Sequence, residues 1–119
     1  MMKNYKIIIQ KNGIELASKV VEAKTFLERL KGLMFDKEMA EFDGLLIKAC
    51  NSIHTCFMNF NLDVIFLDKD FRVVKIIKNL KPWRVTRFYI TATQVLEMKG
   101  GSLVFDLQKG DKLEVLCLN

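Results

Sequence analysis

Short apolar runs separated by turn-forming residues are the feature of this sequence that most constrains its fold. The runs cover residues 5–10, 14–23, 44–47, 62–68, 71–80, 91–98 and 113–118. They are rich in β-branched and aromatic residues, which is typical of strands. Asn12-Gly13 between the first two runs predicts a hairpin turn. Many short strands at close spacing predict a mostly β fold, a compact antiparallel β-sandwich or jelly-roll-like barrel.

The run at residues 71–80 fits two kinds of element. Val73, Ile76, Ile77 and Leu80 have the spacing of an apolar helix face. Three of these four residues are β-branched, however, which favours a strand. Another strand directly before the run and Pro82 soon after it also favour a strand, so we predict one.

One or two short helices are expected beside the sheet. Thr25 can cap a helix that carries Phe26, Leu27, Leu30 and Leu33 or Met34 on one face, with Gly32 near its end. Residues 102–107 are a second candidate, for one helical turn.

The length and composition indicate one domain over residues 1–119. Half of the 119 residues are hydrophobic, there is one proline, and no Gly/Ser-rich linker divides the chain. Three cysteines are too few and odd in number for a disulfide framework. Neither an export signal nor a membrane span is evident, so we expect a cytoplasmic protein. The oligomeric state is left open by the sequence.

The segment from residue 50 to residue 58 holds the only histidine, His54, and two of the three cysteines, Cys50 and Cys56. On an extended strand these three side chains would share one face, where thiolates and an imidazole could bind zinc or copper. Only Cys117 could add a further soft ligand, and the spacing is not that of a structural zinc site. We therefore expect no metal and no cofactor, and we favour a packed thiol beside a structural histidine over a nucleophilic cysteine.

Two carboxylates interrupt apolar runs. Asp63 opens the run that continues with Val64, and Glu97 follows Leu96. If both converged near His54, they could act as a general acid and base in a hydrolase. The alternative, which we favour, is that Asp63 caps a turn and Glu97 points to solvent.

The segment 69–87 is strongly basic. It has seven Lys and Arg residues and one carboxylate, Asp70, whereas the whole chain has a net charge of +5. Cations interleaved with aromatic residues can bind a polyanion or a protein. The cations from Arg72 to Arg87 recur every three residues, which does not put them on one face of a strand. We therefore favour a solvated hairpin and do not expect nucleic acid as the partner.

Several motifs occur in an order that resembles a known family. They are Gly32-Leu33-Met34, Gly44-Leu45-Leu46, Ile53-His54-Thr55-x-Phe57-Met58, Leu62-Asp63-Val64-x-Phe66-Leu67-Asp68, Leu80-x-Pro82-Trp83-Arg84, Val95-Leu96-Glu97, Gly100-Gly101 and Gly110-Asp111. The chain resembles, over about residues 20–116, the uncharacterised prokaryotic family called domain of unknown function 192. The resemblance implies a compact, mostly β, jelly-roll-like sandwich and no established activity. Position 56, a cysteine here, is usually a large apolar or aromatic residue in that family, which argues against Cys56 as a shared ligand or nucleophile.

The polar residues at these motif positions suggest a site. His54, Thr55, Asp63, Arg84 and Glu97 match the family, and Trp83 adjoins Arg84. We expect these residues to line one cleft, with Arg84 binding an anionic group, Trp83 stacking on the ligand, and Thr55 beside them. An internal polar network that only orders loops is the alternative.

Three functions follow from these residues, in order of preference. The first is a binding module for a small ligand or peptide, with a polar cleft around His54, Asp63 and Arg84. The second is a hydrolase that uses Asp63, Glu97 and His54. The third is a polyanion or protein interaction module that uses residues 69–87.

Overall fold

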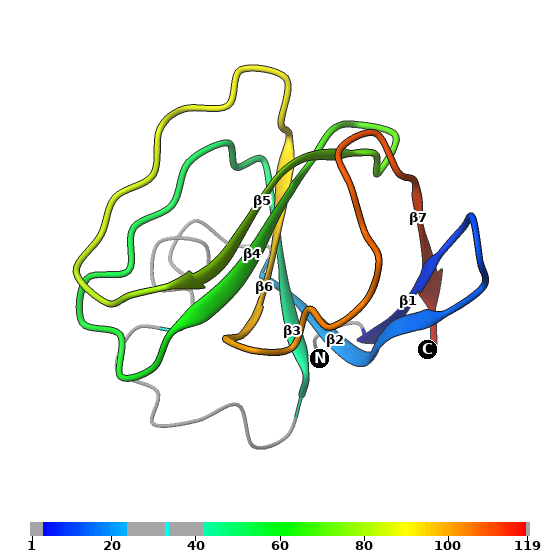
Figure 1. Ribbon diagram of the computed structural model, residues 1–119, viewed down its shortest axis with the longest axis horizontal. Helices are drawn as coiled ribbons and strands as arrows, with labels where there is room; N and C mark the ends of the chain where they lie inside the picture. The colour runs from blue at the N-terminus through cyan, green and yellow to red at the C-terminus, as the bar shows by residue number, and fades with distance from the viewer. Residues whose placement is uncertain (1–3, 24–32, 34–41, 119) are drawn as a thin grey trace.

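The computed structural model describes residues 4–23, 33 and 42–118, which form one curled sheet of seven strands (Figure 1). The strands are β1 (Asn4–Ile9), β2 (Glu15–Ala23), β3 (Gly44–Lys48), β4 (Leu62–Leu67), β5 (Val73–Leu80), β6 (Gln94–Lys99) and β7 (Leu113–Cys117). Every predicted run overlaps one of these strands, so the prediction of a mostly β fold is confirmed. No helix in the described part of the chain is long and apolar enough to cross a membrane.

The strand order across the sheet is β5-β4-β6-β3-β2-β1-β7. All pairs are antiparallel except β2 and β3, which run parallel, so the expectation of a purely antiparallel sheet is wrong at that pair. The long connection after β2 lets β3 enter the sheet in the same direction as β2, as a parallel pair requires. The sheet curls into a half-barrel, and its two end strands meet near their starts, where the Val73 amide donates to the Asp111 carbonyl at 2.8 Å.

Both faces of the central strands β3, β4 and β6 are buried. Alternate side chains of each strand project to opposite sides of the sheet. The inner core takes side chains from all seven strands and includes Ile7, Ile65 and Leu96. The outer core lies on the other face of β3, β4 and β6 and includes Val64 and Val95. This period-two division decides on which side of the sheet each polar residue lies.

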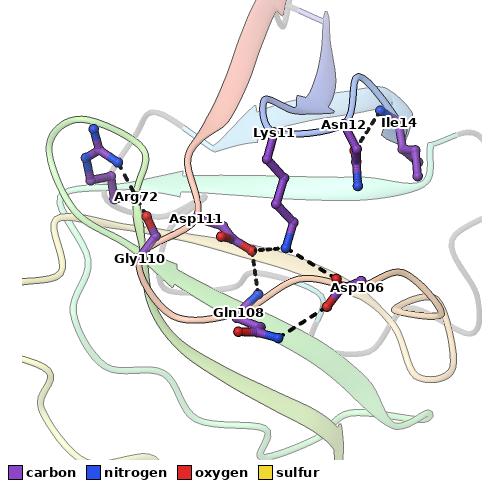
Figure 2. Close-up of polar contacts among 8 residues, drawn as sticks. All are labelled: Lys11, Asn12, Ile14, Arg72, Asp106, Gln108, Gly110 and Asp111. Atoms are coloured by element: carbon purple, nitrogen blue, oxygen red, sulfur yellow. Dashed lines mark hydrogen bonds and ion pairs between the residues drawn. The ribbon is translucent and has the colours of Figure 1, made fainter.

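The connection between β6 and β7 passes over the inner core and is held there by polar contacts. Leu103 is buried in that core. Lys11, in the β1–β2 turn, reaches Asp111 at 2.8 Å and Asp106 at 3.5 Å, and the Asp111 carboxylate also accepts the Gln108 amide (Figure 2). The pKa of Asp111 is lowered and the pKa of Lys11 is raised, in each case mainly by the hydrogen bond between them. Because both groups are solvated, this ion pair orders two loops more than it stabilises the fold.

The predictions for turns and helices have mixed outcomes. Asn12-Gly13 does form the β1–β2 turn, with Gly13 at a φ of 72°, and the run at 71–80 contains a strand. The predicted helix from Thr25 to Gly32 lies outside the described residues. The helical turn expected at residues 102–107 is absent there. Leu103 instead extends to donate its amide to a buried carboxylate.

Candidate functional site

Two loop segments, residues 49–61 and 81–93, lie against each other and cover part of the outer core. The Thr86 amide donates to the Ile53 carbonyl at 2.9 Å, and the Tyr89 amide donates to the Asn51 carbonyl at 2.9 Å. Ile53 and Met58 point into the outer core and anchor the first segment. In Figure 1 the two segments run together along one side of the molecule, outside β4, β5 and β6. We call the exposed side of these two segments the loop surface.

Thr55 fastens the two segments together. Its hydroxyl donates to the Lys81 carbonyl at 2.6 Å and accepts the Arg84 amide at 2.8 Å. Its backbone amide donates to the Arg84 carbonyl at 2.8 Å, and its carbonyl accepts the Trp83 amide at 3.0 Å. Thr55 is fully buried, and these contacts position Trp83 and Arg84.

Trp83 and Phe57 form an exposed aromatic pair. Their ring centroids are 4.7 Å apart, with the planes tilted by 59°. Trp83 is 60% exposed and Phe57 47%. Both have left-handed backbones, with φ of 62° and 64°, a conformation that costs a bulky residue on the order of 1–3 kcal/mol. The hydrogen bonds of Thr55 hold Trp83 in this conformation, and the result is a ring displayed to solvent.

Arg84 presents its guanidinium beside this pair. Its Nη1 atom makes only long contacts, of 3.4 Å to the Pro82 carbonyl and 3.5 Å to the Trp83 carbonyl. Within the described residues no carboxylate lies at ion-pair distance from it. An exposed guanidinium without a carboxylate partner is suited to bind an anionic group.

His54 lies one residue before the buried threonine and is half-buried. Its Nδ1 atom accepts the Cys56 amide at 3.2 Å, and its backbone pairs with that of Val85. The segment around it is not the extended strand that a shared face would require, because Cys56 and Phe57 form a turn. The face shared by Cys50, His54 and Cys56 is therefore not formed. Across the described ranges no group of three His, Cys, Asp or Glu side chains could hold a metal ion.

Asp63 is buried on the inner face of the sheet and accepts three backbone amides. Its Oδ1 atom accepts the Asn79 amide at 2.8 Å, and its Oδ2 atom accepts those of Gly101 at 3.1 Å and Leu103 at 2.8 Å. These bonds tie β5 and the β6–β7 connection to β4. Asp63 thus caps a turn, as in the favoured sequence interpretation.

Glu97 is buried on the outer face, so the expectation that it points to solvent is wrong. Only 4% of it is exposed, and it faces Leu45 and Val64 across the neighbouring strands. Its Oε2 atom has no hydrogen-bond partner among the described residues. Desolvation raises the pKa of this carboxyl to about 8. It is therefore a neutral acid at pH 7, because an apolar setting disfavours the charged form.

The structure brings together His54, Thr55, Trp83 and Arg84. Asp63 and Glu97 lie on opposite faces of the sheet, since Val64 is the residue paired with Glu97. The sequence interpretation also missed the exposed apolar residues that accompany Trp83. The signal that could have found them is the complete absence of Asp and Glu from residues 49–61 and 81–93.

The same order of motifs that lies around this site is found in a known family. The family model DUF192, described as "Uncharacterized ACR", matches residues 7–115. This chain belongs to the DUF192 family. The match includes at least part of every one of the seven strands, and the resemblance inferred from the motifs is confirmed.

Relatives and solved structures agree with membership of the DUF192 family. A UPF0127 protein from Pyrococcus horikoshii is 38% identical over 82 residues, which are 66% of this chain and 70% of that protein. A UPF0127 protein from Pyrococcus furiosus is 34% identical over 109 residues, 86% of this chain and 90% of that protein. A crystal structure of a protein of unknown function from Novosphingobium aromaticivorans has a TM-score of 0.77 at 24% identity, covering 95% of this chain and 84% of that one. A second structure, from Sinorhizobium meliloti, has a TM-score of 0.79 at 22% identity, with coverage of 97% and 94%. These two structures share the fold.

Proposed function

We propose that this protein is a binding module for a small molecule or peptide that carries an anionic group beside a planar or apolar group. The binding site is the corner of the loop surface formed by Phe57, Trp83 and Arg84. Arg84 binds the anionic group, and the two rings contact the apolar part. The half-buried His54 adds a hydrogen bond.

The observation that carries this proposal is the display of Trp83. A large apolar ring is normally buried, because about 25 cal/mol is gained for each Å² of apolar surface removed from water. Here the ring is 60% exposed on a left-handed backbone that a fully buried threonine holds in place. Strain and exposure at one residue are typical of a functional site, since folding alone would favour neither.

The hydrolase alternative is less well supported by the geometry. It requires Asp63, Glu97 and His54 at one substrate. Asp63 already accepts three amides on the inner face, and Glu97 is buried on the outer face. We therefore propose binding and not hydrolysis. A cytoplasmic location accompanies the proposal, and cell fractionation tests it.

The test follows the indole N–H signal of Trp83 by NMR, which needs no assignment because the chain has one tryptophan. The probes are N-acetylphenylalanine, which carries a carboxylate, and its neutral amide. We expect the carboxylate to shift the signal with a Kd on the order of 1 mM and the amide to bind several-fold more weakly.

The variant Arg84→Gln should bind the carboxylate and the neutral amide with equal affinity. Arg72→Gln, which removes another exposed arginine far from Trp83 in the sequence, is the matched control and should leave the difference unchanged. The proposal is wrong if neither probe shifts the signal, or if the carboxylate gives no advantage in the unaltered protein.

A further inference from the structure

The loop surface carries more exposed apolar area than a small ligand could cover. Its exposed large hydrophobic residues are Phe57, Trp83, Val85, Phe88 and Ile90. Val85 is 74% exposed, Phe88 76% and Ile90 90%. Five exposed large apolar residues on two adjacent segments mark an interaction surface.

The charge of the loop surface has one sign. Residues 49–61 and 81–93 contain the cations Lys81, Arg84 and Arg87, and they contain no Asp or Glu. The rest of the chain holds all 14 of its carboxylates. Charge complementarity therefore favours an anionic partner for this surface.

The side chains of Val85, Phe88 and Ile90 are each 74% exposed or more, so they stand out from the surface. A hollow of about 270 Å³ lies nearby, lined by Ala49, Cys50, Asn51, Ala92 and Thr93. None of these is one of the exposed apolar residues or the three cations. A compact ligand would touch one side of a residue such as Ile90, whereas burying a side chain that is 90% exposed requires a partner that surrounds it.

We propose that the loop surface docks on an anionic lipid bilayer. Phe88 and Ile90 enter the boundary between headgroups and acyl chains, Trp83 lies at the interface, and Arg84 and Arg87 face the headgroup phosphates. Fluid acyl chains can surround protruding side chains, aromatic rings prefer the interface, and cations near the surface are attracted by anionic lipids. This inference rests on the proposed function and names the partner of the same site, a lipid headgroup with its chains.

The test measures binding of the whole protein to vesicles of phosphatidylcholine alone and of equal parts phosphatidylcholine and phosphatidylglycerol. We expect binding to the anionic vesicles to be stronger by on the order of tenfold to a hundredfold. The emission of Trp83, the single tryptophan, should shift to shorter wavelength and be quenched by acyl chains that carry bromine. Equal binding of the protein to vesicles with and without phosphatidylglycerol would overturn the proposal.

Variants locate the binding. Phe88→Ser with Ile90→Ser should weaken binding to anionic vesicles by on the order of tenfold or more, and Arg87→Gln should weaken it less. The matched controls are Val104→Ser and Lys109→Gln, which remove an exposed apolar residue and an exposed cation from the β6–β7 connection. All five altered positions are exposed, so the variants should fold, which circular dichroism checks. Equal losses in the controls and in the loop variants would overturn the proposal.

The outcomes separate this inference from the proposed function. If N-acetylphenylalanine shifts the Trp83 signal but no vesicle binds, the lipid partner is wrong and the binding module stands. Such a result would direct the search to an acidic protein. If neither binds, both proposals fail.

Discussion

Glu97 makes the stability of this protein depend on pH in an unusual direction. The carboxyl is buried, has an unpartnered oxygen among the described residues, and has a pKa raised from 4.5 to about 8 by desolvation. Between those two pH values the folded chain keeps a proton that the unfolded chain releases. The free energy of unfolding therefore falls as the pH rises through this window.

The size of the effect follows from the two pKa values. Each factor of ten in the proton affinity is worth about 1.4 kcal/mol. Raising the pH from below 4.5 to above 8 should therefore cost the folded state about 5 kcal/mol through this group, of which about 3 kcal/mol is already lost at pH 7. Glu97→Gln removes the ionisation and nearly keeps the shape. We expect the free energy of unfolding of the variant, relative to that of the unaltered protein, to rise by about 1.4 kcal/mol per pH unit in the middle of the window.

The assay is urea unfolding followed by circular dichroism at several pH values from about 5 to 9. The difference between the two proteins is the quantity of interest, because all other ionisations cancel in it. The absolute size of this difference also contains the cost of burying an amide. The test is therefore how the difference changes with pH. Glu114→Gln, on the exposed face of β7, controls for the loss of a negative charge. A difference that stays flat across the window would refute the reasoning, as would one that falls with increasing pH.

Three further variants test how the site is held. Asp63→Asn should lower the free energy of unfolding by about 2–3 kcal/mol in urea titrations, because an amide group cannot accept all three backbone amides, while N-acetylphenylalanine binding persists; normal stability would contradict the capping role. Thr55→Val, which keeps the shape, should cost about 1–3 kcal/mol in the same assay and weaken the response of Trp83 to the probe. Loss of stability without a change in that response would show that Thr55 does not position the ring. Gly100→Ala should lower the melting temperature, since its Cβ would lie 2.7 Å from the Asn79 side chain and 2.9 Å from Asn61, whereas Gly101→Ala meets no atom within 4 Å and strains only its left-handed backbone.

Strand positions were predictable because they depend on local patterns. The runs around Ile7, Val64, Ile76 and Leu96 each alternate or cluster in a way that favours extended backbone, and each became a strand. The Asn12-Gly13 turn was predictable for the same reason, since a left-handed residue is needed there and glycine adopts that conformation at little cost. The parallel pairing of β2 and β3 was not, because the direction in which two strands pair depends on the path of the chain between them.

The sequence identified the residues of the candidate site and predicted that they lie together. It did not show which contacts join them, or that Asp63 and Glu97 lie on opposite faces of the sheet. His54 and Arg84 are brought together by hydrogen bonds that join residues about thirty positions apart, such as that from Thr86 to Ile53. No local pattern encodes such a contact. Exposure of Phe88 and Ile90 was equally hidden, because an apolar residue is expected in a core unless the structure places it elsewhere.

The sequence by itself determined that this chain forms a mostly β domain of the DUF192 family, since strand periodicity, turn residues and motif order are all local properties. The side of the sheet on which each polar residue lies was decided only by the tertiary structure. Both Asp63 and Glu97 interrupt apolar strands and look alike in the sequence. Pairing of Val64, and not Asp63, with Glu97 puts the two carboxyls on opposite faces, and a shift of one residue would have put them together. Strand register is fixed by packing over the whole sheet. It makes Asp63 a carboxylate that accepts backbone amides and Glu97 a neutral buried acid.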